Sequence, residues 1–196
     1  MIKQLKPLHI IALVFLLSLP TISKAVVVLQ YHHIETTTPS STSTSISLFK
    51  EQIEYLIKND FIIVSLPSMV EDLKNQKQSK DKTVAITFDD GYISVYEHAF
   101  PILKQHNIPF TVFVNTSPLE ENQSSHVSWE QLEEMKAHGA TIANHTHKHS
   151  HLMKEGYKGD AWKEAFIDEI KTAQRILKKR LNQDVRLFAY PYGEFN

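Results

Sequence analysis

The sequence predicts an α/β protein built around a parallel β-sheet. Short apolar runs rich in β-branched residues alternate with segments in which apolar residues recur every three or four positions, the patterns of strands and amphipathic helices. Such alternation is typical of βα units, whose strands run parallel. The chemically unusual residues all follow expected strands, and the carboxyl ends of parallel strands meet on one face. The pattern is compatible with an open sheet and slightly favours a closed or partly closed barrel.

The first 25 residues have the features of a secretory signal peptide. Lys3 and Lys6 precede an apolar run over residues 10–19, and Ser23-Lys24-Ala25 gives the small-x-small pattern of a cleavage site. An uncleaved anchor helix is the alternative, but the run is about half of the ~20 residues that span a bilayer. We therefore expect residues 1–25 to be removed, no stable membrane span to remain, and the protein to be exported to the periplasm or the extracellular space.

Residues 26–196 form the expected mature domain. The chain has 196 residues, 42% of them hydrophobic, with five Gly and eight Pro, which is the profile of one globular domain. The signal segment holds three of the 21 basic residues and none of the 22 acidic ones, so 18 basic residues remain and the net charge is −4. This balance argues against nucleic acid as a partner. There is no cysteine, so stability must come from a buried core, and we expect a monomer.

The amino-terminal half is expected to begin with a buried strand, because residues 26–31 are apolar and mostly β-branched. Phe49, Ile53, Leu56 and Ile57 share one face of a helix at their spacing. The expected elements in order are a strand at 26–31, a helix over 49–57, a strand at 61–64, a short helix near 69–73 and a strand at 83–88.

The carboxyl-terminal half continues the alternation. Pro101 predicts a kink or a break in the next helix. Ser128 with Gln131 forms a capping box, and His138-Gly139 ends the helix that it starts. The expected elements are a helix over 95–103, a strand at 109–114, a helix over 128–138, a strand at 141–144, a long amphipathic helix over 166–181 and a strand at 185–190.

Two adjacent carboxylates, Asp89 and Asp90, end the strand at 83–88. An Asp-Gly pair is a common turn, so a simple strand exit is the alternative. Neighbouring carboxylates raise each other's proton affinity unless a cation or a hydrogen-bond donor compensates. A bound metal ion would supply that compensation.

Four histidines at alternate positions follow the strand at 141–144: His145, His147, His149 and His151. An extended segment or a helical turn can present two of them to one ion. A solvated polar loop with incidental metal affinity is the alternative. With Asp90 as a third ligand, two imidazoles make a site that leaves positions open for water and substrate, as a catalytic metal requires.

Two other strand ends hold candidate residues. The last expected strand closes with Phe-Ala-Tyr-Pro-Tyr-Gly at residues 188–193, which by itself is an aromatic strand end and a turn. The first strand ends at Tyr31-His32-His33. Taken alone, such a pair of histidines is more often a surface feature than a catalytic one.

Together these residues resemble the NodB-type polysaccharide deacetylases, carbohydrate esterase family 4. That family has three motifs in this order, T-F-D-D-G, H-[ST]-x-x-H and P-Y-G, which stand here at residues 87–91, 145–149 and 191–193. The resemblance covers roughly residues 26–196. It implies a distorted (β/α) barrel and a hydrolase that removes acetyl groups from N-acetylated amino sugars.

The resemblance also implies roles for individual residues. Asp90, His145 and His149 would bind one divalent metal ion, with zinc expected ahead of other transition metals. Asp89 would be the general base, and the backbone N–H of Tyr192 would stabilise the oxyanion. His147 and His151 fall outside the motif and are expected to be flanking residues.

The sequence departs from the family pattern in two places. Most members have an Arg-Pro-Pro-Tyr-Gly third motif whose Arg holds the catalytic Asp, and Ala189 occupies that place here. Phe-Ala-Tyr-Pro-Tyr-Gly instead looks like the subgroup that deacetylates poly-β-1,6-N-acetylglucosamine, the biofilm exopolysaccharide. In most members the general-acid His lies near the C-terminus, whereas in this subgroup a Tyr-His pair on the first strand supplies it, so His32 becomes the expected acid. The chain stops three residues after Gly193, where similar proteins continue, and we expect the deacetylase domain to be C-terminally truncated.

The expected function is therefore metal-dependent N-deacetylation of a polysaccharide, and two alternatives remain. A periplasmic His-rich protein that stores or delivers zinc would explain the four histidines but gives no role to Asp89. A non-catalytic glycan-binding remnant is favoured by the early C-terminus. Metal stoichiometry tests the first alternative, and an assay of deacetylation tests the second.

Overall fold

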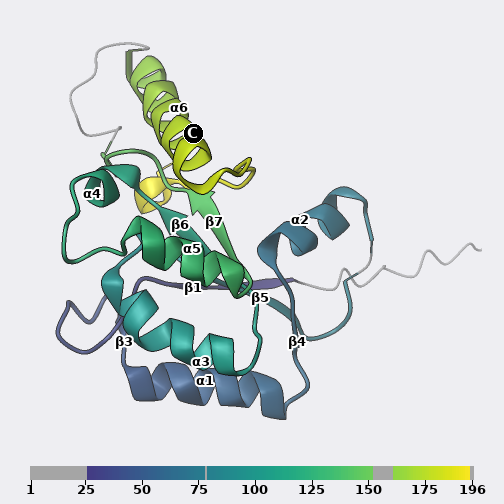
Figure 1. Cartoon of the computed structure of the whole chain (residues 1–196). Coiled ribbons are helices and arrows are strands. Elements are labelled where there is room, and N and C mark those ends of the chain that lie inside the picture. The colour runs from purple at the N-terminus through teal and green to yellow at the C-terminus, as the bar shows by residue number, and fades with distance from the viewer. Residues whose placement is uncertain (1–25, 78, 152–160, 195–196) are drawn as a thin grey trace, which may run out of the picture.

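A parallel β-sheet carries the fold, as the sequence predicts. The computed structural model describes residues 26–77, 79–151 and 161–194, so the expected signal peptide lies outside the described residues. The sheet has the order β1-β5-β6-β7, and β4 also pairs with β5 (Figure 1). All of these pairs are parallel. The strands are β1 (Val27–Tyr31), β4 (Ile62–Ile63), β5 (Thr83–Phe88), β6 (Phe110–Val114) and β7 (Ala140–Asn144).

Two expectations about the strands are corrected. The first strand is not buried: Val27 and Val28 are 46% and 44% exposed, because β1 lies at the edge of the described sheet. Residues 185–190 do not form a strand. Only Phe188 bridges to Asn144, which exchanges two backbone hydrogen bonds of 3.1 Å with Leu187 and Ala189. Among the described residues this segment does not pair with β1, so the sheet is open there.

The helices connect the strands and cover the sheet (Figure 1). Ile57 does not join the buried face of its helix and is 43% exposed, whereas Phe49, Ile53 and Leu56 are buried. The short α4 was not predicted. The helices are α1 (Ile46–Lys58), α2 (Leu66–Lys74), the π-helix η1 (Val95–Ala99), α3 (Phe100–Gln105), α4 (Thr116–Glu120), α5 (Trp129–Ala137), α6 (Ala161–Leu181) and the 3-10 turn η2 (Pro191–Gly193), and a small separate sheet is formed by β2 (His33–Ile34) and β3 (Ser43–Thr44).

Local chemistry explains two helix boundaries. The capping box at the start of α5 is present: the Ser128 N–H donates to Gln131 Oε1 at 2.8 Å, and the Gln131 N–H donates to Ser128 Oγ at 3.2 Å. The chain passes from η1 to α3 next to Pro101, which lacks the N–H of a regular helix and clashes with the preceding turn. The predicted break is thus confirmed as a change of helix type. No helix among the described residues has both the length and the apolarity needed to cross a membrane.

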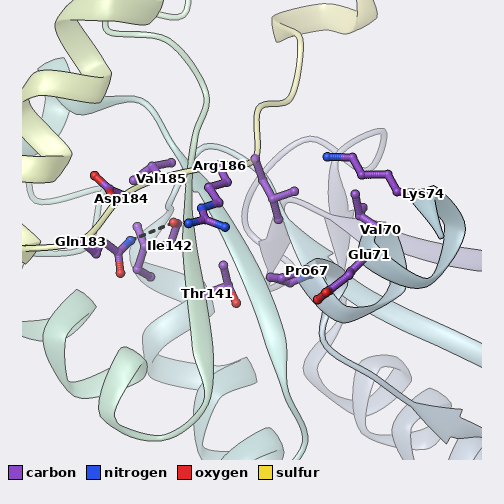
Figure 2. Close-up of a pocket in the computed structure, with 11 residues that line it drawn as sticks. Pro67, Val70, Glu71, Lys74, Thr141, Ile142, Gln183, Asp184, Val185 and Arg186 are labelled. Carbon is purple, nitrogen blue, oxygen red and sulfur yellow. Dashed lines mark hydrogen bonds between the residues drawn. The ribbon is translucent and has the colours of Figure 1, made fainter.

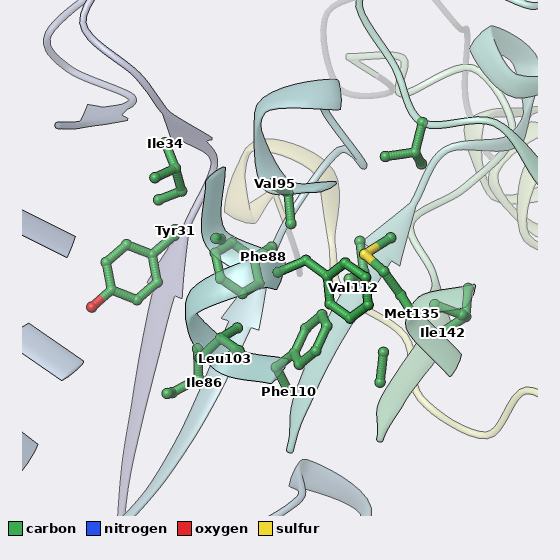
Figure 3. Packing of buried hydrophobic residues seen from close by; sticks show 14 of the residues in the cluster. Tyr31, Ile34, Ile86, Phe88, Val95, Leu103, Phe110, Val112, Met135 and Ile142 are labelled. Atoms are coloured by element: carbon green, nitrogen blue, oxygen red, sulfur yellow. The ribbon is translucent and has the colours of Figure 1, made fainter. Parts of the chain in front are cut away.

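The apolar core combines buried residues of α1, α3 and α5 with those of the strands, and Figure 3 shows its side chains packed around Phe88 and Phe110. Alternate residues of a strand point to opposite faces, and the even-numbered residues of β5, β6 and β7 contribute to this core. Phe88 is at its centre, with ring centroids 5.6 Å from Tyr31 and 5.9 Å from Phe110. The odd-numbered residues face the other way and include the buried Thr87 and Thr111. This packing fixes the carboxyl ends of the strands relative to one another.

Candidate active site

The predicted site residues come together where the strands end. Asp89 and Asp90 follow β5, and His145 follows β7. One ligand atom from each of Asp90, His145 and His149 lies within 4.8 Å of the others. Asp90 Oδ1 is 3.3 Å from His145 Nε2 and 3.1 Å from His149 Nε2, and the two Nε2 atoms are 3.2 Å apart. The structure therefore gathers the three expected ligands at one point.

A tight turn after β5 orients Asp90. Asp90 and Gly91 both have left-handed backbone conformations, with φ of 70° and 71°, which Asp tolerates and Gly adopts readily. A Cβ at position 91 would lie 2.9 Å from Val114 Cγ1, so only glycine fits without movement. The turn is fastened to the following loop, because the Val127 N–H donates to the Gly91 carbonyl at 3.0 Å.

His145 is held in the tautomer that a metal ligand needs. Its ring is buried, and Nδ1 lies 3.0 Å from the carbonyl oxygen of Ala189. A carbonyl only accepts hydrogen bonds, so Nδ1 carries the proton and Nε2 presents its lone pair toward Asp90. Ala189, which replaces the arginine of the family pattern, thus acts here through its backbone. The sequence contained no signal for this contact.

The segment that leads to His149 is neither helical nor extended, so neither geometry considered for the histidine tract is correct. Thr146 and His149 have φ of 71° and 58°. The Thr146 N–H donates to Asn144 Oδ1 at 2.8 Å, and the His149 N–H donates to Thr146 Oγ1 at 3.1 Å. These bonds fold the chain back and bring the His149 ring within 4.8 Å of the His145 ring, centroid to centroid.

The electrostatics of this cluster fit a cation. Asp90 Oδ1 is buried and has no hydrogen-bond partner, so its two short contacts with imidazole nitrogens lack hydrogen-bond geometry. Burial alone would raise the pKa of Asp90, but the approach of His145 and His149 outweighs it and holds the pKa of this carboxyl well below its ordinary value. Two imidazole nitrogens and one carboxylate oxygen are a donor set that suits Zn²⁺. The residues present therefore fit a divalent ion.

Asp89 lies beside the three ligands in a different environment. Its backbone N–H donates to the Tyr31 carbonyl at 2.9 Å, and its Oδ2 accepts a hydrogen bond from the Gln30 side chain. Burial raises the pKa of Asp89, against the opposing effects of His145, Gln30 and His32. His32 lies in the bend between β1 and β2, close enough to Asp89 to act on its charge. The expected acid thus lies within electrostatic range of the expected base.

Aromatic rings on one side of the cluster were not predicted from the sequence. His33 stacks on Tyr92 at 3.6 Å between centroids, and its Nδ1 is 3.0 Å from Glu35 Oε1. Burial, together with the nearby Asp90, raises the pKa of Tyr92 to about 12. His126 packs against Tyr92 with centroids 5.0 Å apart, and burial lowers the pKa of His126. No spacing in the sequence links His126 to the motifs, whereas Tyr92 directly follows one of them.

The two remaining histidines of the tract have different neighbours. His147 Nδ1 lies 2.8 Å from Thr116 Oγ1 of α4. His151 stacks on Tyr192 with centroids 3.3 Å apart and an interplanar angle of 13°, and its Nδ1 is 3.1 Å from Glu194 Oε1. Tyr192 has a left-handed φ of 56° and also contacts His149, with centroids 4.5 Å apart. His151 therefore connects the segment at residues 145–151 to the Pro-Tyr-Gly turn at residues 191–193.

One cavity of the structure is separate from this site. A space of about 440 Å³ lies between α2 and the segment at residues 183–187, with Thr141 of β7 on its wall (Figure 2). Its polar side chains include Lys74, Arg186 and Glu71. None of the candidate catalytic or metal-binding residues lines it.

A parallel α/β sheet with a carboxylate and two imidazoles gathered beyond its strand ends, next to a second buried carboxylate, is the arrangement that a metal-dependent hydrolase requires. The family model for polysaccharide deacetylases matches residues 76–196. The chain belongs to the polysaccharide deacetylase family.

Relatives support this assignment. The poly-beta-1,6-N-acetyl-D-glucosamine N-deacetylase of Staphylococcus epidermidis is 32% identical over 155 residues, which are 76% of this chain and 53% of that protein. The chain spans about half the length of the curated relatives it matches. Among solved structures, IcaB from Ammonifex degensii is 34% identical with a TM-score of 0.77, over 88% of this chain and 76% of that one. The Streptococcus pyogenes deacetylase PplD, solved in complex with acetate, is 29% identical with a TM-score of 0.77, over 87% and 75%.

Proposed function

We propose that this protein is a divalent-metal-dependent N-deacetylase of an N-acetylglucosamine-containing polysaccharide, with biofilm exopolysaccharide as its substrate. The observation that carries the proposal is the convergence of Asp90, His145 and His149 within 4.8 Å, beside the buried Asp89. The similarity to staphylococcal poly-beta-1,6-N-acetyl-D-glucosamine N-deacetylases supports the choice of a poly-β-1,6-linked substrate.

The proposed ion is Zn²⁺, held by Asp90 and by the Nε2 atoms of His145 and His149. When bound, such an ion supplies Lewis-acid polarisation of the acetyl carbonyl and lowers the pKa of a coordinated water towards ~7. The carbonyl of Ala189 keeps His145 in the correct tautomer for this role.

Asp89 is proposed as the general base that takes a proton from the attacking water. Its raised pKa makes the carboxylate a better proton acceptor than an exposed Asp, and Gln30 orients it. The backbone N–H of Tyr192 is proposed to stabilise the oxyanion of the tetrahedral intermediate.

His32 is proposed as the general acid that protonates the departing amine. Its place in the bend after β1, within electrostatic range of Asp89, supports this role. The products are acetate and a free glucosamine unit within the polymer. We also propose that the protein is exported after removal of residues 1–25 and works as a monomer.

The contacts of His147 and His151 weigh against a zinc store. His147 is turned to Thr116 and His151 to Glu194. Within the part of the chain that the structure describes, Asp90, His145 and His149 are the one group of three or more such side chains close enough to hold an ion.

Acetate release from N-acetylated β-1,6-glucosamine oligomers tests the proposal. The protein loaded with one equivalent of zinc should release acetate, and removal of zinc by a chelator should abolish the release reversibly. Asp89→Asn should lose turnover by ~10²–10⁴-fold, because the proton acceptor is removed, while it still binds zinc. Near-normal release by Asp89→Asn at saturating zinc would exclude Asp89 as the base, and an inactive zinc-loaded wild type would favour a glycan-binding role.

A further inference from the structure

We propose that Glu169 of α6 is a positioning residue for the metal site, which holds the loop between His145 and His149 in its ligand-binding conformation. This inference rests on the proposed function. Glu169 belongs to none of the three sequence motifs and lies 20 positions beyond His149 in the chain.

The contact is made to the loop backbone. Glu169 Oε2 accepts hydrogen bonds from two consecutive N–H groups, that of His147 at 3.1 Å and that of Lys148 at 2.6 Å. A carboxylate that accepts from backbone N–H groups makes stronger hydrogen bonds than a neutral acceptor. Glu169 therefore fastens the middle of the loop to α6.

Each of the five backbone N–H groups from His145 to His149 donates a hydrogen bond, and the acceptors belong to several different elements. The His145 N–H donates to the Val114 carbonyl at 3.0 Å. The Thr146 N–H donates to Asn144 Oδ1 at the end of β7, and the His149 N–H donates to Thr146 Oγ1 within the loop. Glu169 supplies the other two. The carbonyl groups of Thr146 and His147 are held from α4, by the N–H groups of Thr116 and Ser117 at 3.3 and 2.8 Å. Glu169 is thus the side chain that satisfies the two N–H groups in the middle of the loop.

The loop needs this restraint because its conformation is unfavourable by itself. Thr146 and His149 both have positive φ. A β-branched residue such as Thr146 rarely adopts this region unless the surrounding structure imposes it, although histidine adopts it more readily. His145 is anchored separately, by Val114 at its backbone and by Ala189 at its ring. Loss of Glu169 should therefore displace His149 more than His145.

A second contact from the same helix strengthens the connection. Asn144, which directly precedes His145, donates from Nδ2 to the Ile170 carbonyl at 3.0 Å. Its Oδ1 accepts from the Thr146 N–H. Consecutive residues of α6, Glu169 and Ile170, thus hold both the start and the middle of the loop.

The test is the zinc affinity of the metal-stripped protein, measured by competition with a chromophoric chelator. Outer-shell partners of metal ligands are typically worth ~10–100-fold in affinity. Glu169→Ala should weaken zinc binding by that factor, and Glu169→Gln, which keeps an acceptor oxygen without the charge, should lie between it and wild type. Saturating zinc should restore most of the acetate release. Asp168→Ala is the matched control, because Asp168 is an exposed neighbour on the same helix, and it should bind zinc like wild type.

Thermal unfolding of the metal-free variants separates positioning from general stability. If Glu169→Ala unfolds without zinc, the comparison rests on Glu169→Gln, and an affinity equal to that of wild type would then overturn the inference. Equal affinities of a folded Glu169→Ala and wild type would overturn it directly. If wild type itself bound no zinc, the proposed function would fail instead, so the two failures are distinguishable.

Discussion

At the scale of single residues, His32 is proposed as the general acid because of its position in the fold. It sits in the bend that follows β1, beside the backbone contact between Asp89 and Tyr31. Its charge acts to lower the pKa of Asp89, against the larger effect of burial. The neighbouring His33 is engaged differently, with Glu35 and with the Tyr92 ring.

Replacing His32 by Ala should lower the turnover of an amide substrate by ~10²–10⁴-fold, because the leaving amine loses its proton donor. Zinc affinity should hardly change, since His32 is not one of the three ligands. The loss should shrink for an activated ester, whose leaving group needs no proton. Steady-state kinetics on both substrates measure this, with His33→Ala as the milder comparison. Normal amide hydrolysis by His32→Ala would place the general acid elsewhere.

His151 was expected to be a flanking residue, but in the structure its ring stacks on Tyr192 and its Nδ1 lies 3.1 Å from Glu194 Oε1. A change at position 151 should therefore affect the Pro-Tyr-Gly turn. His151→Ala should retain zinc but lower turnover, by up to ~10²-fold if the Tyr192 backbone is displaced from the reacting carbonyl. Lys148→Ala, an exposed change in the same loop, is the control. Loss of the ion from His151→Ala would mean that the ligand set is wrong.

At the scale of elements, the turn that joins β5 to η1 depends on Gly91. The left-handed φ at position 91 and the 2.9 Å approach of Val114 Cγ1 both oppose a side chain there. Gly139, after α5, also has a positive φ of 94° but has no atom within 4 Å of its virtual Cβ. A side chain at position 139 would therefore meet only the unfavourable backbone conformation. A side chain at position 91 would meet that conformation and the clash with Val114 as well.

Gly91→Ala should lower the free energy of unfolding by about 1–3 kcal/mol and should also weaken zinc binding through Asp90. Gly139→Ala should cost less, because it carries only the conformational penalty. In the double variant Gly91→Ala with Val114→Ala, part of the steric cost should disappear, as a non-additive free energy. Urea unfolding of metal-free wild type, of the single variants Gly91→Ala, Val114→Ala and Gly139→Ala, and of the double variant measures these free energies. Equal losses at the two glycines would contradict a steric role for Val114.

At the scale of the whole molecule, metal binding should stabilise the fold, because the ligands come from separate elements that only the folded chain assembles. One zinc ion per chain is expected, and at a free zinc concentration 100 times the dissociation constant the gain is about 2.7 kcal/mol. Elemental analysis and thermal unfolding measure the stoichiometry and the shift in Tm. Asp90→Ala should remove the shift. Several ions per chain would favour the zinc-store alternative.

Processing of the N-terminus is a second property of the whole chain. The mature protein should begin at or near Val26, because the small residues Ser23 and Ala25 fit a cleavage site and β1 begins at Val27. Mass spectrometry of exported protein decides this. A protein that still begins at Met1 would support the uncleaved anchor.

The sequence by itself determined the parallel α/β fold, the bounds of β5, the capping box of α5 and the three side chains proposed as metal ligands. These features depend on local patterns, such as an apolar run closed by Asp89-Asp90 or a Ser128–Gln131 pair, and on motifs at strand ends. Patterns of this kind remain visible in a linear chain because the interacting groups are neighbours or because strand ends converge in any parallel sheet.

Only the tertiary structure decided how the site is supported. The exposure of β1, the failure of residues 185–190 to form a full strand, and the contacts of Ala189, His126 and Glu169 all depend on which segments lie side by side. A backbone carbonyl or a helix carboxylate that orients a ligand leaves no periodicity in the sequence, because its partner can be any residue that the fold places within hydrogen-bond distance.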